Sequence, residues 1–317
     1  MNTLRTTDST AAMRPRLDIS QDLLLRFVSF LDAKPKTIQT YHRALRQLFR
    51  YFSLHSISRP CREDILAFRR WLQAGHKPTT IQNYITAARL FFLWTSQEGL
   101  YPNVAEHVKG ARIDRSHKKE YLTSGQVIAV MDRVDRSGLR GLRDYAILAL
   151  MVTGGLRTVE VTRADIGDLG TAGDNAVLFI QGKGQDEKAE SIRLQPNVEL
   201  AIRNYLQKRR LCNRNEPLFA STSNNSAGCR LSTRSVSGIV KTRLRDAGYD
   251  SDRLTAHSLR HTAVTLSLLA GKPIDEVQQF ARHASITTTQ IYNHALDRTN
   301  NSCGEAVALA IFPPLPS

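Results

Sequence analysis

The C-terminal stretch ARHASITTTQIYNHAL, residues 281–296, places His283 nine residues before Tyr292. A tyrosine hydroxyl has a pKa of about 10 and is a poor nucleophile until a base takes its proton and cations neutralise the group that it attacks. A tyrosine in a helical stretch is also an ordinary amphipathic packing residue. Tyr292 is therefore a candidate reagent only if other parts of the chain supply a base and cations.

An arginine follows two glycines in the stretch MVTGGLRTVEV, residues 151–161. The pattern predicts that a core helix ends at the glycines and that Arg157 lies just before a new helix containing Glu160. The free N–H groups of a helix start favour anions, so Arg157 at this junction indicates an anion site. The alternative is that Arg157 and Glu160, three residues apart, simply pair with each other.

A third polar group lies in the stretch TAHSLRHTAV, residues 255–264. His257 and Arg260 are three residues apart and share one face of the predicted helix. His257 and His261 have the spacing of a metal-binding pair, but no acidic or sulfur ligand is evident nearby and Arg260 would place a fixed charge beside the ion. We expect neither a metal nor another cofactor. Lys183, at the tip of a predicted hairpin, is by itself an ordinary turn lysine.

The composition indicates a polyanionic partner. The chain has 317 residues and a formal net charge of +15, and 33 of its 44 basic residues are arginines. A broad positive field attracts polyanions, and the planar fork of arginine suits phosphate. An arginine bias of the source genome would produce the same count, so residue usage alone does not separate the two explanations.

Cysteine spacing and hydropathy bear on location. The cysteines lie far apart with no Cys-x-x-Cys spacing, which argues against a disulfide framework and against a zinc ribbon. They are Cys61, Cys212, Cys229 and Cys303. The N-terminal residues lack the apolar segment of a signal peptide, and the longest apolar run, YAILALMV, is far too short to span a bilayer. We therefore expect reduced thiols in a cytoplasmic protein with no membrane role.

Two similar segments predict how the first part of the chain folds. KPKTIQTYHRALRQLFRYF begins at Lys34, and KPTTIQNYITAARLFFLWT begins at Lys77. Proline just inside a helix start and apolar residues at helical spacing predict one long helix for each copy. A shorter amphipathic stretch precedes each copy, which predicts a compact four-helix unit. The polar face of its first long helix carries the candidate contacts to a nucleic acid or other polyanion, Lys36, His42, Arg43, Arg46 and Arg50.

A polar segment separates this unit from a second helical region. We predict a flexible tail over 1–16, a four-helix domain over 17–103, a linker over 104–121 and a second domain over 122–317. In the second domain, Thr123 and Gln126 form a capping-box pattern, and the run NAVLFIQGKGQDEKAESIRL predicts a β-hairpin. The predicted fold class is mainly α: a four-helix N-terminal domain followed by an α-rich domain with a small antiparallel β-sheet.

Taken in chain order, the polar residues resemble those of the tyrosine recombinase family, of the phage integrase and Xer type. The motifs TGGLRTVEV, QGKG, HSLRHTA and HASITTTQIYNH stand in the order and spacing of that family. The resemblance implies a SAM-like core-binding domain over 17–103 and a catalytic domain over 122–317 that close round duplex DNA. The catalytic residues that it implies are Arg157, Lys183, His257, Arg260, His283 and the nucleophile Tyr292, with Glu160 in support.

Residues of these types can cut a phosphodiester without a metal. The two arginines can fork the non-bridging oxygens and stabilise the crowded phosphorus as charge builds. His283 can donate a further hydrogen bond, and His257 can act as a general acid or base near neutral pH. Lys183 on its hairpin can deliver a proton to the departing 5′ oxygen. By similarity, Tyr292 then carries a 3′-phosphotyrosyl link that allows rejoining to another strand.

The resemblance also implies an assembly on DNA. Protomers that are monomers in solution would form a homo-tetramer on recombination sites and exchange strands through a Holliday junction, for integration, excision or resolution. The apolar run AVALAIF, residues 306–312, would dock into a neighbouring protomer or onto its own domain. A type IB topoisomerase would use nearly the same residues. A catalytically silent DNA-binding or architectural protein would explain the charge without using the six polar residues.

One local departure from the family pattern is visible. Ala281 and Arg282 stand where the family usually has Leu-Gly before the second histidine. The change alters the expected geometry of this loop and makes Arg282 a further candidate DNA contact.

Overall fold

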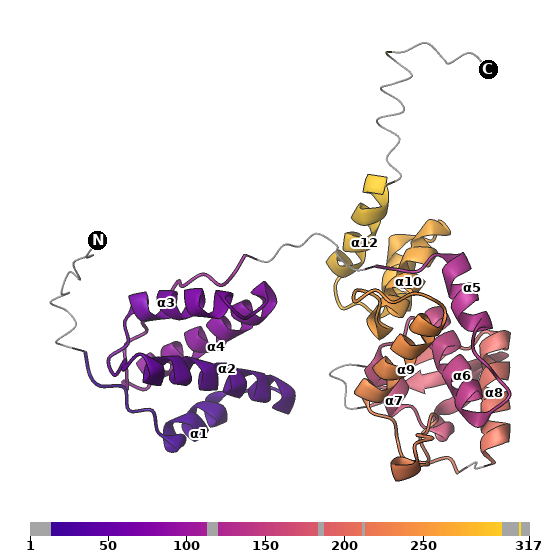
Figure 1. Cartoon of the computed structure of the whole chain (residues 1–317), viewed down its shortest axis with the longest axis horizontal. Helices are drawn as coiled ribbons and strands as arrows, with labels where there is room; N and C mark the ends of the chain where they lie inside the picture. Colours follow the sequence, from indigo (N-terminus) through magenta and orange to yellow (C-terminus); the bar gives the residue numbers. More distant parts are fainter. Residues whose placement is uncertain (1–13, 113–119, 183–186, 211–212, 300–310, 312–317) are drawn as a thin grey trace. The chain divides into compact units, whose positions relative to one another are not determined.

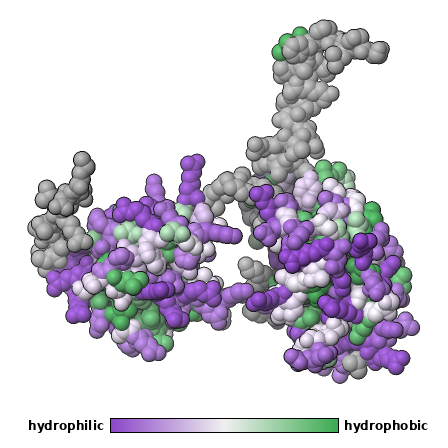
Figure 2. Space-filling view, viewed as in Figure 1, coloured by the Kyte–Doolittle hydropathy of each residue, from purple (hydrophilic) through white to green (hydrophobic). Residues whose placement is uncertain are grey.

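The computed structural model describes residues 14–112, 120–182, 187–210, 213–299 and 311. Two compact units divide the chain, Met1–Arg115 and Ser116–Ser317. Each unit has a hydrophobic core of its own. Their visible surfaces are mostly hydrophilic, with scattered apolar patches (Figure 2). Among the described residues no helix is both long and apolar enough to cross a lipid bilayer.

The N-terminal unit is built from the two predicted repeats. Each repeat forms a 20-residue helix with proline in its first turn, and these helices, α2 and α4, pack against each other (Figure 1). Proline is favoured there because the first helical N–H groups have no partner within the helix. The helices of the unit are α1 (Gln21–Phe30), α2 (Pro35–Leu54), α3 (Arg62–Gln73) and α4 (Pro78–Gln97).

The core of this unit takes side chains from all four helices. Phe27, Leu48, Phe68 and Phe91 come from α1, α2, α3 and α4 respectively, and each is at most 1% exposed. Burial of such a side chain contributes about 1.5–3 kcal/mol, so the four-helix packing that the repeats predicted has a sizeable driving force.

The N-terminal core extends past α4 into the residues that the sequence predicted as linker. Tyr101, Ala105 and Val108 are buried in the same cluster, and Arg69 donates to the carbonyl oxygen of Lys109 at 2.8 Å. The small apolar residues of this polar stretch give it an inner face. Residues 104–112 therefore pack as part of the first unit, whereas the sequence pattern predicted a linker over 104–121.

The C-terminal unit is mainly helical and carries one small sheet, so the predicted fold class is confirmed. Its helix α6 packs against α8 and α10, and side chains on all its sides are buried, as expected from its apolar sequence. The helices are α5 (Ser124–Asp132), α6 (Leu139–Gly154), α7 (Thr158–Arg163), α8 (Pro196–Arg209), α9 (Thr233–Asp246), α10 (Ala256–Leu269), α11 (Ile274–Ala281) and α12 (Ile286–Thr299), with short 3-10 turns η2 (Ile166–Asp168) and η3 (Asn224–Ser226).

The sheet has three antiparallel strands in the order β1 (Leu169–Ala172), β2 (Asn175–Ile180) and β3 (Glu190–Arg193). β2 and β3 are the two runs of the predicted hairpin, and Val177 lies opposite Arg193 in their register. β1 was not predicted, because its sequence, LGTA, has weak strand propensity and acquires its order by pairing with β2.

A capping box begins α5 as predicted. The Thr123 hydroxyl accepts from the N–H of Gln126 at 3.3 Å, and the Gln126 side chain accepts from the N–H of Thr123 at 2.9 Å. The residues before this helix are tied to the same unit, because the N–H of Leu122 donates to the buried hydroxyl of Thr262 on α10 at 2.9 Å.

Candidate active site

A glycine turn between α6 and α7 positions Arg157. Gly155 has a φ of 57° and ends α6 in the left-handed conformation, which glycine adopts at little cost. Arg157 then caps α7, as the sequence predicted, and Glu160 reaches back to it. One carboxylate oxygen of Glu160 accepts from the Arg157 N–H at 2.9 Å and the other from its guanidinium at 2.7 Å. The Arg157 side chain nonetheless remains 26% exposed.

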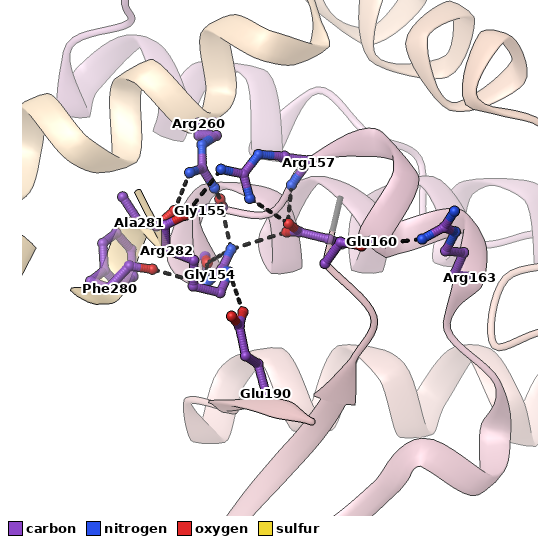
Figure 3. A network of polar contacts seen from close by, with 11 residues as sticks. Gly154, Gly155, Arg157, Glu160, Arg163, Glu190, Arg260, Phe280, Ala281 and Arg282 are labelled. Atoms are coloured by element: carbon purple, nitrogen blue, oxygen red, sulfur yellow. Dashed lines mark hydrogen bonds and ion pairs between the residues drawn. The ribbon is translucent and has the colours of Figure 1, made fainter. Parts of the chain in front are cut away.

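Arg260 reaches the same turn from α10. Its side chain is 1% exposed and donates to the carbonyl oxygen of Gly155 at 2.6 Å and to that of Ala281, at the end of α11. Burial, with the charges of Arg157 and Arg282, lowers the pKa of Arg260 to about 10. Three segments distant in the sequence thus gather the arginine side chains round the glycine turn (Figure 3).

His283 follows α11 directly. Its ring Nδ1 hydrogen-bonds with the Thr289 hydroxyl at 2.9 Å, and its main-chain N–H donates to the carbonyl oxygen of Gln278 at 3.1 Å. Burial, followed by the positive charges of Arg260 and Arg157, lowers the pKa of His283 to about 4. The imidazole is therefore neutral near pH 7, so one ring nitrogen can donate a hydrogen bond and the other can accept one, but both cannot donate.

Tyr292, on α12, is only 5% exposed and packs in a small apolar cluster with Val264 and Val277. Its ring is nearly parallel to that of His283, with 6.2 Å between the centroids. Burial raises the pKa of the Tyr292 hydroxyl to about 12, although Arg260 and Arg157 act in the opposite direction. Its proton therefore does not leave near neutral pH without an acceptor.

A histidine that the catalytic assignment omitted supplies a contact to this hydroxyl. The Tyr292 hydroxyl hydrogen-bonds with Nδ1 of His261, whose side chain is 4% exposed. His257 is exposed, and its ring centroid lies 4.4 Å from that of His261. The i, i+4 spacing of the two histidines was visible in the sequence, but only the packing of α12 on α10 shows which of them touches Tyr292.

Arg282 differs from its predicted role as a DNA contact. Its side chain is 9% exposed and turns inward. It donates to the carbonyl oxygens of Gly154 at 3.3 Å, of Gly155 at 3.1 Å and of Phe280 at 2.8 Å, and to the carboxylate of Glu160 at 3.1 Å. Both terminal nitrogens of the guanidinium are occupied by main-chain and carboxylate oxygens, and its Nε is buried, so the group has little capacity to bind an external phosphate.

A cleft of about 940 Å³ opens beside these residues in the C-terminal unit. Arg157, Arg282 and His283 line it together with β3 and the end of α11. Gly182, also in its lining, immediately precedes Lys183. Lys183 itself lies outside the described residues, as does most of the apolar run 306–312.

The candidate DNA contacts of the N-terminal unit are all exposed on α2. A second groove of about 790 Å³ lies along this helix, and its basic lining residues are His42, Arg43, Arg46 and Arg50. Lys36 is exposed one turn or more before them on the same helix. A positive helix face of this kind fits a phosphate backbone, which attracts arginine without regard to base sequence.

Comparison with known proteins decides the relationship. Residues 120–299 match the phage integrase family, and residues 26–99 match the phage integrase N-terminal SAM-like domain. The chain belongs to the phage integrase family. This confirms the resemblance drawn from the motifs.

Relatives of this phage integrase family member are named tyrosine recombinases. It is 31% identical to tyrosine recombinase XerC of Herpetosiphon aurantiacus over 288 residues, covering 86% of this chain and 90% of the relative. It is 30% identical to XerC of Pelobacter propionicus, covering 90% and 94%. The chain is accordingly a site-specific tyrosine recombinase, a DNA strand-exchange enzyme.

Solved structures share the fold of this phage integrase family member. The XerH site-specific recombinase bound to palindromic difH substrate, in its post-cleavage complex, superposes with a TM-score of 0.71 at 20% identity and covers 94% of this chain and 92% of its own. A lambda integrase dimer bound to a COC′ core site gives a TM-score of 0.68 at 17% identity, covering 88% and 77%.

Proposed function

We propose that this recombinase cuts duplex DNA by attack of Tyr292 on a phosphodiester. The phenolic oxygen bonds to phosphorus, the bond from phosphorus to the 5′ oxygen breaks, and a 3′-phosphotyrosyl link forms beside a free 5′ hydroxyl. The observation that carries this proposal is the convergence of Tyr292, His283 and the two arginines on one site, although they come from different segments of the chain.

The arginines act on the phosphate. Arg157 keeps part of its guanidinium exposed in the cleft, and Arg260 is fixed beside it by two carbonyl oxygens. Two preorganised guanidinium groups stabilise the charge that grows on the non-bridging oxygens, and they need no reorganisation during the reaction. Neutral His283, which also lines the cleft, donates a further hydrogen bond to the phosphate.

Proton transfer follows from the contacts of the hydroxyl. His261 is hydrogen-bonded to the Tyr292 hydroxyl, so we propose that it accepts the proton that Tyr292 loses on attack. His257, exposed on the preceding turn, remains a candidate acid or base for the rejoining step. Lys183 is the candidate donor of the proton that the 5′ oxygen takes up.

The substrate is double-stranded DNA, which the exposed basic face of α2 in the N-terminal unit also contacts. The solved structures named above are recombinases bound to DNA, and a lambda integrase tetramer bound to a Holliday junction shares the fold with a TM-score of 0.66. These neighbours support a homo-tetramer that assembles from monomers on DNA and exchanges strands pairwise through a Holliday junction.

Covalent trapping tests the assignment. A binding site is selected from random duplexes with the wild-type protein and then nicked next to the cleavage position, so that the small fragment diffuses away and the attached strand cannot rejoin. We expect a covalent band on a denaturing gel with wild type and none with Tyr292→Phe. Tyr249→Phe is the control and should give an unchanged band, because Tyr249 is a half-buried tyrosine that packs against the main hydrophobic core of the C-terminal unit. A covalent band from Tyr292→Phe would refute the nucleophile.

A second arm separates recombination from relaxation. Two differently labelled duplexes carrying the site are mixed with the wild-type protein, and recombinant products are sought. Relaxation of supercoiled DNA with no recombinant product would favour a topoisomerase activity instead.

A further inference from the structure

Position 282 has a backbone conformation that favours glycine. Arg282 ends α11 with a φ of 52° and a ψ of 48°, in the left-handed region. A side chain with a Cβ is strained there, whereas glycine is not. The sequence nevertheless has arginine where the family usually has glycine, and the contacts of its side chain indicate what it contributes there.

The contacts of Arg282 lie at the centre of the polar cluster. Its guanidinium links the glycine turn after α6, the end of α11 and the carboxylate on α7 (Figure 3). The main-chain oxygen of Arg282 also accepts from the guanidinium of Arg157 at 3.1 Å. Arg282 therefore holds Arg157 in two ways, through its own carbonyl group and through the carboxylate that both arginines share.

Glu160 is the residue that connects the arginines electrostatically. Its carboxylate is 0% exposed and is shared by Arg157 at 2.7 Å and Arg282 at 3.1 Å. Burial alone would raise the pKa of Glu160, but Arg282, followed by Arg157, lowers it, so the group is an anion. Without Arg282, the buried carboxylate of Glu160 would pair with Arg157 alone. The negative charge of Glu160 would then offset more of the positive charge of Arg157 and reduce the attraction of Arg157 for phosphate.

We propose that Arg282 is a positioning residue for strand cleavage. Its guanidinium neutralises Glu160, so that the positive charge of Arg157 remains available to the phosphate. The inference rests on the proposed function. Glu190 on β3 lies 3.9 Å from the Arg282 guanidinium but is 37% exposed, so water screens this second carboxylate more than it screens Glu160. Arg282 acts through Arg157 and does not touch the DNA.

A double-mutant cycle tests the link between Arg282 and Glu160. Arg282→Gly removes the guanidinium and relieves the backbone, so it is the variant most compatible with the fold. We expect it to slow single-turnover cleavage at saturating protein by at least about tenfold, and the same substitution in a Glu160→Gln background to change the rate by less than about threefold. An equal effect in both backgrounds would overturn the proposal.

Arg282→Lys is the matched control, because it keeps both the charge and the backbone strain. It should cleave faster than Arg282→Gly; equal rates would show that charge is not what matters. The dissociation constant for DNA and its salt dependence should stay unchanged in Arg282→Gly, whereas loss of a direct phosphate contact would reduce the slope by about 0.9. That reduction, or failure of Arg282→Gly to fold, would also overturn the proposal.

The wild-type protein supplies the remaining control. If it formed no covalent band, the proposed function would fail and this inference with it. If the wild-type band formed and Arg282→Gly produced it at the same rate, only the role of Arg282 would be refuted.

Discussion

Replacement of His261 tests how the nucleophile loses its proton. With a pKa of about 12, forming a free Tyr292 phenolate at pH 7 would cost about 7 kcal/mol. If His261 takes the proton while the bond to phosphorus forms, no free phenolate has to form, and the existing hydrogen bond from the hydroxyl places Nδ1 within reach of that proton. We expect His261→Phe, which keeps a ring of similar size, to slow cleavage by roughly 10²- to 10⁴-fold near pH 7.

The pH dependence and a modified substrate make this prediction specific. The rate of His261→Phe should rise about tenfold per pH unit, since hydroxide then removes the proton, while the wild type rises less. A substrate with sulfur in place of the bridging 5′ oxygen has a leaving group that needs no proton. It should rescue Lys183→Ala but not His261→Phe.

His261→Asn provides the structural control, because its amide can keep a hydrogen bond to the Tyr292 hydroxyl but cannot take its proton. It should melt within a few degrees of wild type and cleave as slowly as His261→Phe. Wild-type cleavage by His261→Phe, or its rescue by the sulfur substrate, would refute the assignment of His261 as proton acceptor.

Other perturbations give distinct outcomes. Arg260→Ala should slow cleavage by at least roughly 10²-fold. It should also lower the free energy of unfolding, measured with urea, by about 1–3 kcal/mol for each carbonyl left unpaired. Arg157→Ala should also slow cleavage, but with a smaller loss of stability. Arg46→Ala should leave the melting temperature unchanged and weaken DNA binding, with a salt slope lower by about 0.9 in a titration. The pKa of His283 falls from 6.5 to about 4 on folding, so the unfolded chain binds more protons between these values and stability is lost as pH falls through that window. His283→Gln should flatten this part of a pH series of urea unfolding curves.

Local signals predicted most of the elements that carry the site. Proline in the first turn located α2 and α4, and the Thr123 capping box located the start of α5. The two glycines at the end of α6 located Arg157 at the start of the next helix. These features depend on nearest-neighbour geometry, so a single sequence is enough to recognise them.

Contacts between distant segments could not be predicted in the same way. His261 and Tyr292 are 31 residues apart and meet only because α12 packs on α10. Arg282, an arginine in place of the family's usual glycine, was a candidate DNA contact, but its acceptors include carbonyl groups 127 and 128 residues earlier. A positive charge in the sequence gives no direction in space, and the three-dimensional fold determines whether it faces solvent or the interior.

The acceptors that hold Arg260 and Arg282 are mostly main-chain carbonyl oxygens, from Gly154, Gly155, Phe280 and Ala281. Every amino acid carries such an oxygen, so a substitution at position 280 or 281 that preserves the turn leaves the acceptor in place. Substitutions around the arginines are therefore tolerated if they keep the backbone in place. The side-chain acceptor Glu160 differs, because replacing it removes the acceptor itself.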